Sequence, residues 1–152
     1  MCGRYALTAE PDVLAALFAL RVLQEFDPRY NLAPSQEAPV IVSSQDGGRQ
    51  AEPMRWGLIP SWSKDPKIAY RTINARSETA AIKPSFRAAF KRRRCLVPAS
   101  WFYEWKREGK EKIPFRIRRT DGDPLAFAGL WEHWNGDSDE PPRTTFTVLT
   151  TD

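Results

Sequence analysis

Residues 95–118 decide the fold class, and they read CLVPASWFYEWKREGKEKIPFRIR. An apolar run opens the segment, an aromatic-rich run fills residues 101–106, and residues 107–110 form a turn with one glycine. Beyond the turn, apolar Ile113, Phe115 and Ile117 alternate with other residues, a period typical of a half-buried strand. Three successive strands with no helix between them predict an antiparallel sheet.

Further strands are predicted on both sides of this segment. Residues 125–131 and 144–151 follow it, and residues 40–42 and 54–59 precede it, the last ended by Pro60. Gly47 and Gly48 mark a turn at residues 45–50. The sequence therefore predicts an α+β domain that is mainly antiparallel β with a few helices.

Three helices are expected in the first two thirds of the chain. Thr8 is predicted as the N-cap of the first, because five apolar residues follow at helical spacing: Val13, Leu14, Leu17, Phe18 and Leu20. Residues 75–82 form the second, and Pro84 opens the third, with Phe86, Ala89 and Phe90 on one face. Residues 28–39 and 61–67 are expected to be loops.

Length and composition indicate one folded domain over residues 1–152. The chain is 41% apolar and 12% aromatic, which excludes a disordered protein. No apolar run is long enough to span a bilayer, and Met1 to Tyr5 lack the apolar core of a secretory signal. We therefore expect a monomer in the cytoplasm, nucleoid-associated when bound to DNA, of a bacterium, or in the nucleus of a eukaryote.

The charge of the chain is unevenly distributed. The net charge is +4, but residues 83–119 hold thirteen Lys or Arg against three Glu. This polarity predicts one positive face suited to a polyanion, although a merely solvated surface is an equal alternative.

Cys2 is the residue with the most distinctive chemistry. Removal of Met1 would leave it as the N-terminus, with an α-amine and a thiol two carbons apart. The amine can condense with an aldehyde, and the thiol can then close a thiazolidine ring. Gly3 allows close backbone approach and Arg4 offers a phosphate contact. Taken alone, an unremarkable second residue is the more frequent interpretation.

Glu104 and Asn74 are the next candidates. Glu104 stands among aromatic residues, which favours a partly desolvated carboxyl group that acts as a general acid/base. The alternative is a Glu on an edge strand that reaches water or pairs with an arginine on the next strand. Asn74 precedes a predicted helix and is most simply its N-cap. Its alternative role is an amide that orients a nucleophile or a sugar hydroxyl.

The remaining reactive or aromatic residues receive mostly structural interpretations. Most of the six tryptophans are expected in the core, but Trp62 lies in a polar loop where an indole can stack on an unpaired base. Cys95 is expected to be buried and inert, and His133 to lie on the surface. Two cysteines and one histidine supply neither a disulfide framework nor a zinc site, so no metal and no cofactor is expected.

Five ordered motifs and two shorter ones resemble the SRAP (SOS-response-associated peptidase) family across residues 1–152. The five are residues 1–5 (MCGRY), 30–34 (YNLAP), 55–62 (RWGLIPSW), 73–79 (INARSET) and 101–106 (WFYEWK), and the two are residues 128–131 (AGLW) and 148–152 (VLTTD). One motif is fixed at the terminus, so a chance match is improbable.

The resemblance implies a barrel-like β core and a function in the DNA damage response. It implies binding of single-stranded DNA and a covalent thiazolidine between Cys2 and the ring-opened sugar of an abasic site, which shields the site from strand cleavage. Cys2 is then the nucleophile, Asn74 positions it, and Glu104 is the acid/base. The family lines its DNA channel at positions matching Asn31, Pro34, Trp62, Arg76 and Thr150, to which we add Arg4.

One family feature is missing from the sequence. The resemblance implies a catalytic histidine in a His-Arg-Met-Pro-like segment beyond the last strand, but the sequence ends before it, and His133 lies in another motif. The simplest expectation is a domain truncated at its C-terminus. Two other functions stay open, a cysteine peptidase with Cys2 as N-terminal nucleophile and a non-catalytic reader of single-stranded or modified DNA.

Overall fold

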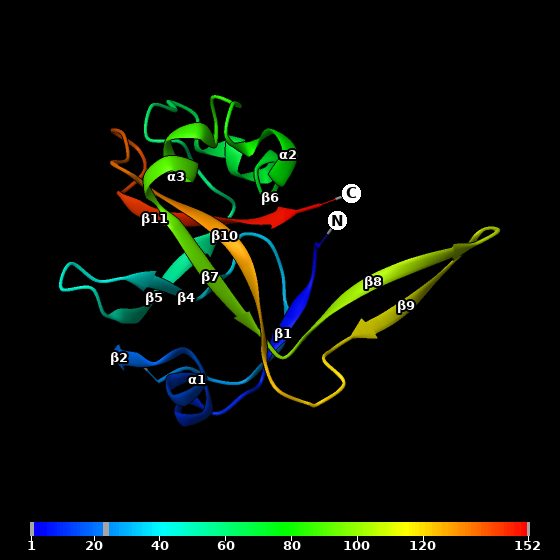
Figure 1. Cartoon of the computed structure of the whole chain (residues 1–152). Helices are drawn as coiled ribbons and strands as arrows, with labels where there is room; N and C mark the ends of the chain where they lie inside the picture. The colour runs from blue at the N-terminus through cyan, green and yellow to red at the C-terminus, as the bar shows by residue number, and fades with distance from the viewer. Residues whose placement is uncertain (1, 23–24, 152) are drawn as a thin grey trace.

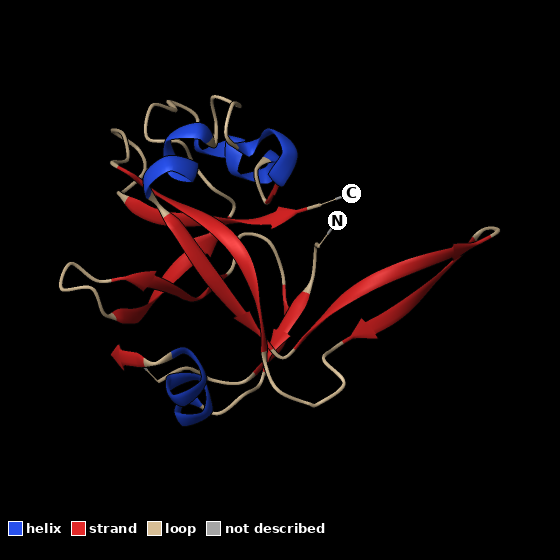
Figure 2. Cartoon of the chain, viewed as in Figure 1, coloured by secondary structure: helices blue, strands red, loops and turns tan. Residues whose placement is uncertain are grey.

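A closed ring of five strands forms the core of the protein (Figure 2). The computed structural model describes residues 2–22 and 25–151. In ring order the strands are β5 (Arg49–Trp56), β4 (Glu37–Ser43), β7 (Arg94–Ala99), β10 (Leu125–Trp134) and β11 (Arg143–Thr150). Neighbours are antiparallel except β5 and β11, whose parallel pairing closes the ring. The predicted α+β class with a mainly antiparallel, barrel-like core is confirmed.

Alternate residues of the ring strands point inward and fill the barrel. The buried set includes Val40, Met54, Trp56, Val97, Phe146 and Val148. Gly129 of β10 leaves room for this packing, because a Cβ there would lie 2.9 Å from both the Cys95 sulfur and the Thr147 carbonyl oxygen. Any side chain at this position would therefore push two ring strands apart.

A second sheet lies against the barrel in the order β3 (Arg29–Leu32), β1 (Tyr5–Leu7), β8 (Trp101–Glu108) and β9 (Glu111–Ile117). Only Ser100 separates β7 from β8, so one stretch of chain serves both sheets. The Ser100 hydroxyl oxygen accepts the backbone N–H groups of Thr8 and Ala9. Figure 1 shows that the β8–β9 hairpin extends away from the barrel.

Short elements cover one end of the barrel, at the top of Figure 1. They are the 3₁₀ helix η1 (Pro66–Arg71), strand β6 (Asn74–Arg76) and helices α2 (Ser77–Ala80) and α3 (Arg87–Arg92). A small buried cluster joins β6, α2 and α3 to the barrel: Leu58, Ala75, Ala80, Phe86, Ala89 and Leu130. Near it, Gly57 has φ +121°, and a Cβ there would lie 2.7 Å from the Ala69 carbonyl oxygen.

The predicted first helix begins too early and ends too late. Helix α1 spans Pro11–Phe18, and Glu10, not Thr8, is its N-cap. Thr8 is instead tied to Ser100 through its backbone and hydroxyl. Leu20 belongs to strand β2 (Leu20–Val22), and only Leu14 of the helix is fully buried. The N-cap prediction fails because a long-range contact competes for Thr8.

Three further boundaries are corrected. Residues 28–39 are not a continuous loop, because β3 lies inside them and β4 begins at Glu37. The strand predicted at residues 54–59 is the end of β5, which stops at Trp56. The alternating residues of β9 do not form a half-buried strand, since Phe115 is 49% and Ile117 40% exposed.

Candidate functional site

Cys2 lies buried just before β1, with 6% of its surface exposed. Its thiol sulfur is 3.9 Å from the carbonyl oxygen of Arg4, to which it donates a weak hydrogen bond. The same carbonyl accepts the backbone N–H of Tyr103 at 3.0 Å, so the N-terminal segment is anchored to β8. The N-terminal motif is thus held as an extension of the second sheet.

Asn74 makes the contact that defines the site. Its side-chain amide nitrogen donates to the carbonyl oxygen of Cys2 at 2.8 Å, across 72 residues of sequence. Asn74 lies on β6, opposite Val148 of β11, and α2 begins only at Ser77, so the N-cap interpretation is wrong. The amide oxygen of Asn74 is buried and has no hydrogen-bond partner within the described residues. It is therefore an available acceptor beside Cys2.

Glu104 is the third group near Cys2. It lies half-buried on β8, opposite Phe115 of β9, and its negative charge acts on the Cys2 thiol. The aromatic enclosure expected around it is incomplete, because Trp105 is 44% and Phe115 49% exposed. The fold brings Cys2, Asn74 and Glu104 together from three different strands or strand extensions.

Burial raises the pKa of the Cys2 thiol to about 11. A backbone hydrogen bond with Arg4 opposes this shift, and the charge of Glu104 adds to it. The thiol is therefore protonated at neutral pH, and any reaction at sulfur needs a base that removes the proton. Burial also raises the pKa of Cys95 to about 12, and Cys95 is buried as expected.

We expect Cys2 to be alkylated slowly by iodoacetamide at pH 8, because a thiol with a pKa of about 11 is then only about 0.1% thiolate. The rate should rise about tenfold per pH unit and level off near pH 11. Peptide mapping by mass spectrometry separates Cys2 from Cys95. Protein unfolded in urea is the control and should titrate near pH 8.5. A native profile with its midpoint at that same pH would contradict the buried thiol.

The six residues predicted to line a DNA channel divide into two groups. Arg4 is near Cys2 in sequence, and its guanidinium donates a hydrogen bond to the Gly3 carbonyl oxygen at 3.0 Å. Arg76 of β6 and Thr150 of β11 are paired in register, and Arg76 is two residues after Asn74. Asn31 is exposed on β3, and Pro34 follows that strand. Trp62 is 59% exposed. Arg4 follows Cys2 by two residues, and Arg76, paired with Thr150, follows Asn74 by two residues, so these three are adjacent to the site in sequence or register.

The loop that carries Trp62 is firmly held although its indole faces solvent. Trp134 is buried and donates from its ring nitrogen to the Ser63 carbonyl at 2.7 Å, and Ser63 is itself buried. Of the other tryptophans, Trp56 is buried and Trp101 and Trp131 are half-buried, whereas Trp105 is exposed. Trp62 is exposed, as expected, and the expectation that the other tryptophans lie mostly in the core fails at Trp105.

Tyr5 is a neighbour of Cys2 that the sequence did not single out. Its side chain is fully buried, and its hydroxyl has no hydrogen-bond partner within the described residues. Burial raises the pKa of Tyr5 and the nearby Cys2 thiol adds to this, while Arg29 opposes it. Its place in the motif at residues 1–5 was the only signal that could have marked it.

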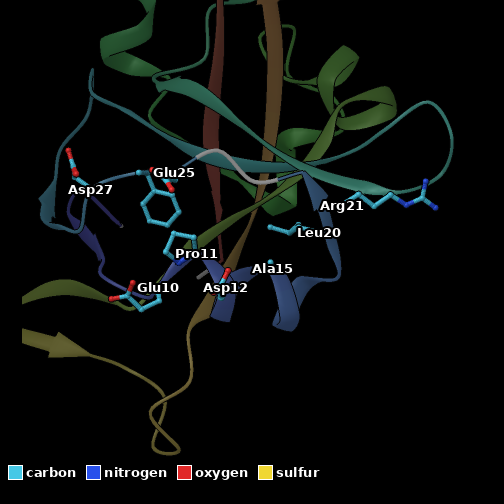
Figure 3. Close-up of a pocket in the computed structure, with 9 residues that line it drawn as sticks. Glu10, Pro11, Asp12, Ala15, Leu20, Arg21, Glu25 and Asp27 are labelled. Carbon is cyan, nitrogen blue, oxygen red and sulfur yellow. The ribbon is translucent and has the colours of Figure 1, made fainter.

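A pocket of about 900 Å³ lies elsewhere, beside α1 and β2 (Figure 3). Four acidic residues line it, Glu10, Asp12, Glu25 and Asp27, with Arg21 as the one lining cation. None of Cys2, Asn74 and Glu104 lines this cavity. Its charge does not suit a nucleic acid, so the site at Cys2 is the better candidate.

The basic segment at residues 83–119 does not form one positive face. Part of it is α3 and its flanks, and part is the β8–β9 hairpin, which Figure 1 shows on different sides of the molecule. His133 is exposed on β10, as expected. Within residues 2–22 and 25–151, no group of three His, Cys, Asp or Glu residues could hold a metal ion. No helix in the same ranges is long and apolar enough to cross a membrane.

Comparisons with known proteins agree on one family. The family model described as SOS response associated peptidase (SRAP) matches residues 1–152. The chain is 45% identical over 155 residues to the abasic site processing protein YoqW of Bacillus subtilis (strain 168), covering 99% of this chain and 68% of that protein. It is 32% identical over 194 residues to the abasic site processing protein HMCES of Xenopus tropicalis, covering 100% of this chain and 58% of that protein.

A solved structure shares the fold. A protein from Bacteroides thetaiotaomicron superposes with a TM-score of 0.89 at 29% identity, covering 99% of this chain and 68% of that one. The chain therefore spans about two thirds of the length of YoqW and of this structure.

Proposed function

Because the chain belongs to the SOS response associated peptidase (SRAP) family, we propose that it binds single-stranded DNA and covalently traps abasic sites through Cys2. Two of its relatives, YoqW and HMCES, are named abasic site processing proteins. The observation that carries the proposal is the hydrogen bond from the Asn74 amide to the Cys2 carbonyl oxygen, at 2.8 Å. It fixes the backbone of the residue whose amine and thiol would react.

The proposed reaction uses both nucleophiles of Cys2 once Met1 has been removed. The α-amine attacks the aldehyde carbon of the ring-opened sugar, and the resulting carbinolamine loses water to give an imine. The sulfur then adds to the imine carbon, the sulfur proton passes to nitrogen, and a five-membered thiazolidine forms. One water is lost overall, and no oxidant or metal is consumed.

Each of the other two site residues has a role in this reaction. The thiol is protonated at neutral pH, so a nearby base must take its proton, and Glu104 is close enough to act on it electrostatically. The Asn74 amide oxygen is a buried acceptor without a partner in the described part of the chain, suited to a sugar hydroxyl or to the Cys2 amine.

We propose that the bound single-stranded DNA runs over six residues of the protein: Arg4, Asn31, Pro34, Trp62, Arg76 and Thr150. Arg4 and Arg76 would contact phosphates, because a guanidinium offers two parallel donors to a phosphate group. Thr150 and Arg76 are register partners on adjacent strands, two residues beyond Asn74, which supports their lining the same path.

The decisive experiment is the intact mass of the protein mixed with single-stranded DNA that holds one abasic site. The expected species has the mass of the protein from Cys2 onward plus the DNA, less one water. DNA with an intact base at that position is the control and should give no adduct. Cleavage of a peptide library without any DNA adduct would favour a peptidase instead. Binding without an adduct would favour a non-catalytic reader.

Trp62→Ala should weaken binding to single-stranded DNA by about 1–3 kcal/mol, the typical contribution of one aromatic ring stacked on a base. Trp62 is 59% exposed on an anchored loop, so its removal should leave the fold intact. Fluorescence anisotropy on a Cys2→Ala background measures affinity without crosslinking. Tyr70→Ala is the matched control, because Tyr70 is 69% exposed and is not among the six channel residues. Equal affinity of Trp62→Ala and the parent would exclude stacking.

A further inference from the structure

Helix α3 and its flanks carry a dense group of cations that the proposed site does not use. We define the α3 basic surface as the five exposed residues Lys83, Arg87, Lys91, Arg92 and Arg94. Over residues 2–22 and 25–151, the side chains of these five form no ion pair and no hydrogen bond. Arg93, between them, differs because it pairs with the buried Glu132 at 2.6 Å.

Three of these cations, Arg87, Lys91 and Arg94, line a shallow hollow on the protein surface. Its volume is about 580 Å³, and its lining consists of Ala81, Arg87, Ala88, Phe90, Lys91 and Arg94. Three of these six are cations and none is acidic, so the hollow is suited to an anion. Arg87 and Lys91 also stand at i and i+4 on the helix, where like charges repel, and a bound anion would relieve that repulsion.

A rigid packing contact connects the α3 basic surface to the proposed site. Phe86 and Ala89 pack in one buried cluster with Ala75 of β6, the residue between Asn74 and Arg76. Figure 1 likewise shows α2, α3 and β6 gathered on one side of the barrel. A DNA strand that passes Arg76 would therefore be close to the further cations of α3, which packs against β6.

From these contacts we infer that the α3 basic surface binds the phosphodiester backbone of DNA flanking the strand held at Cys2. The inference rests on the proposed function and extends it to a second contact area. Phosphate groups are favoured over an acidic peptide because α3 packs through Phe86 and Ala89 against β6, and Arg76 of β6 is one of the proposed DNA contacts. A polyanion also suits five cations spread over twelve residues better than one small anion does.

The double variant Arg87→Glu/Lys91→Glu tests this inference when its affinity for DNA is measured as a function of DNA length. On a Cys2→Ala background, affinity for an oligonucleotide of about 25 nucleotides should fall tenfold or more, while affinity for one of about five nucleotides should not change. The slope of log affinity against log salt should become shallower by about 0.7 for each lost contact to a single strand. Extending the short oligonucleotide by a single-stranded or by a duplex flank shows which form of backbone is bound.

Lys110→Glu/Lys112→Glu is the matched control, because it makes the same charge change on the exposed hairpin tip, on another side of the molecule. Thermal unfolding monitors the fold of both variants, and Arg87→Ala/Lys91→Ala serves if the reversed charges destabilise α3. An equal loss in the hairpin variant, or no dependence on DNA length, would overturn the inference. A length-dependent loss specific to α3 supports it even if the parent protein forms no adduct, an outcome that would reject only the covalent function.

Discussion

Protein that keeps a residue attached to the Cys2 nitrogen should form no stable adduct with abasic single-stranded DNA. In that form the Cys2 nitrogen belongs to a peptide bond, and an amide nitrogen does not condense with an aldehyde. The thiol alone would give only a reversible hemithioacetal. An amine further up the chain can form an imine but cannot close the five-membered ring with the Cys2 sulfur. We therefore expect loss of the denaturant-resistant species.

An N-terminal extension with a protease site directly before Cys2 provides both forms from one preparation. The uncleaved protein should bind abasic DNA with no denaturant-resistant product, and cleavage should restore the crosslink. Noncovalent affinity, measured on DNA with intact bases, controls for steric obstruction by the extension. Crosslinking of the uncleaved form at the rate of the cleaved form would reject the aminothiol chemistry. Crosslinking by a Cys2→Ser variant at the parent rate would reject it as well, because the sulfur would then be dispensable.

Local pattern predicted the ring strands well, because their short apolar runs reflect burial. Residues 40–42 and 95–97 lie in β4 and β7, where alternate side chains fill the barrel. Strand β3 could not be found in this way, because three of its four residues are exposed and only pairing with β1 defines it. Apolar residues alternate along β9, which is the pattern of a half-buried strand. The β8–β9 hairpin projects from the barrel, however, so both faces of its outer part are exposed to solvent.

The candidate site shows the same division between local and long-range information. Asn74 before an apparent helix fits an N-cap in every local respect. The parallel pairing of β6 with β11 instead makes it a strand residue that reaches Cys2. Cys2, Asn74 and Glu104 are far apart in sequence, so only the resemblance to a family could group them in advance. The raised pKa of the Cys2 thiol depends on burial by distant strands and has no sequence signal.

Glu104→Gln should form the crosslink about 10²–10⁴-fold more slowly than the parent, the usual contribution of general acid–base catalysis. Opening the sugar ring moves one proton, expulsion of water from the carbinolamine needs another, and the protonated Cys2 thiol must release a third. Glutamine keeps the shape and hydrogen bonding of glutamate but cannot carry a proton. Single-turnover time courses measure the rate, and binding on a Cys2→Ala background should be unchanged.

The effect of Glu104 on the thiol makes this prediction unusually sharp. The negative charge of Glu104 raises the pKa of Cys2, so its removal should lower that pKa and speed alkylation of Cys2 by iodoacetamide. If thiol acidity alone set the rate, Glu104→Gln would crosslink faster than the parent. If Glu104 transfers protons, the variant is alkylated faster but crosslinks more slowly. Glu108→Gln, on the same strand but exposed near the hairpin tip, should change neither rate. Parent-like crosslinking by Glu104→Gln would assign Glu104 a structural role and require another acid/base.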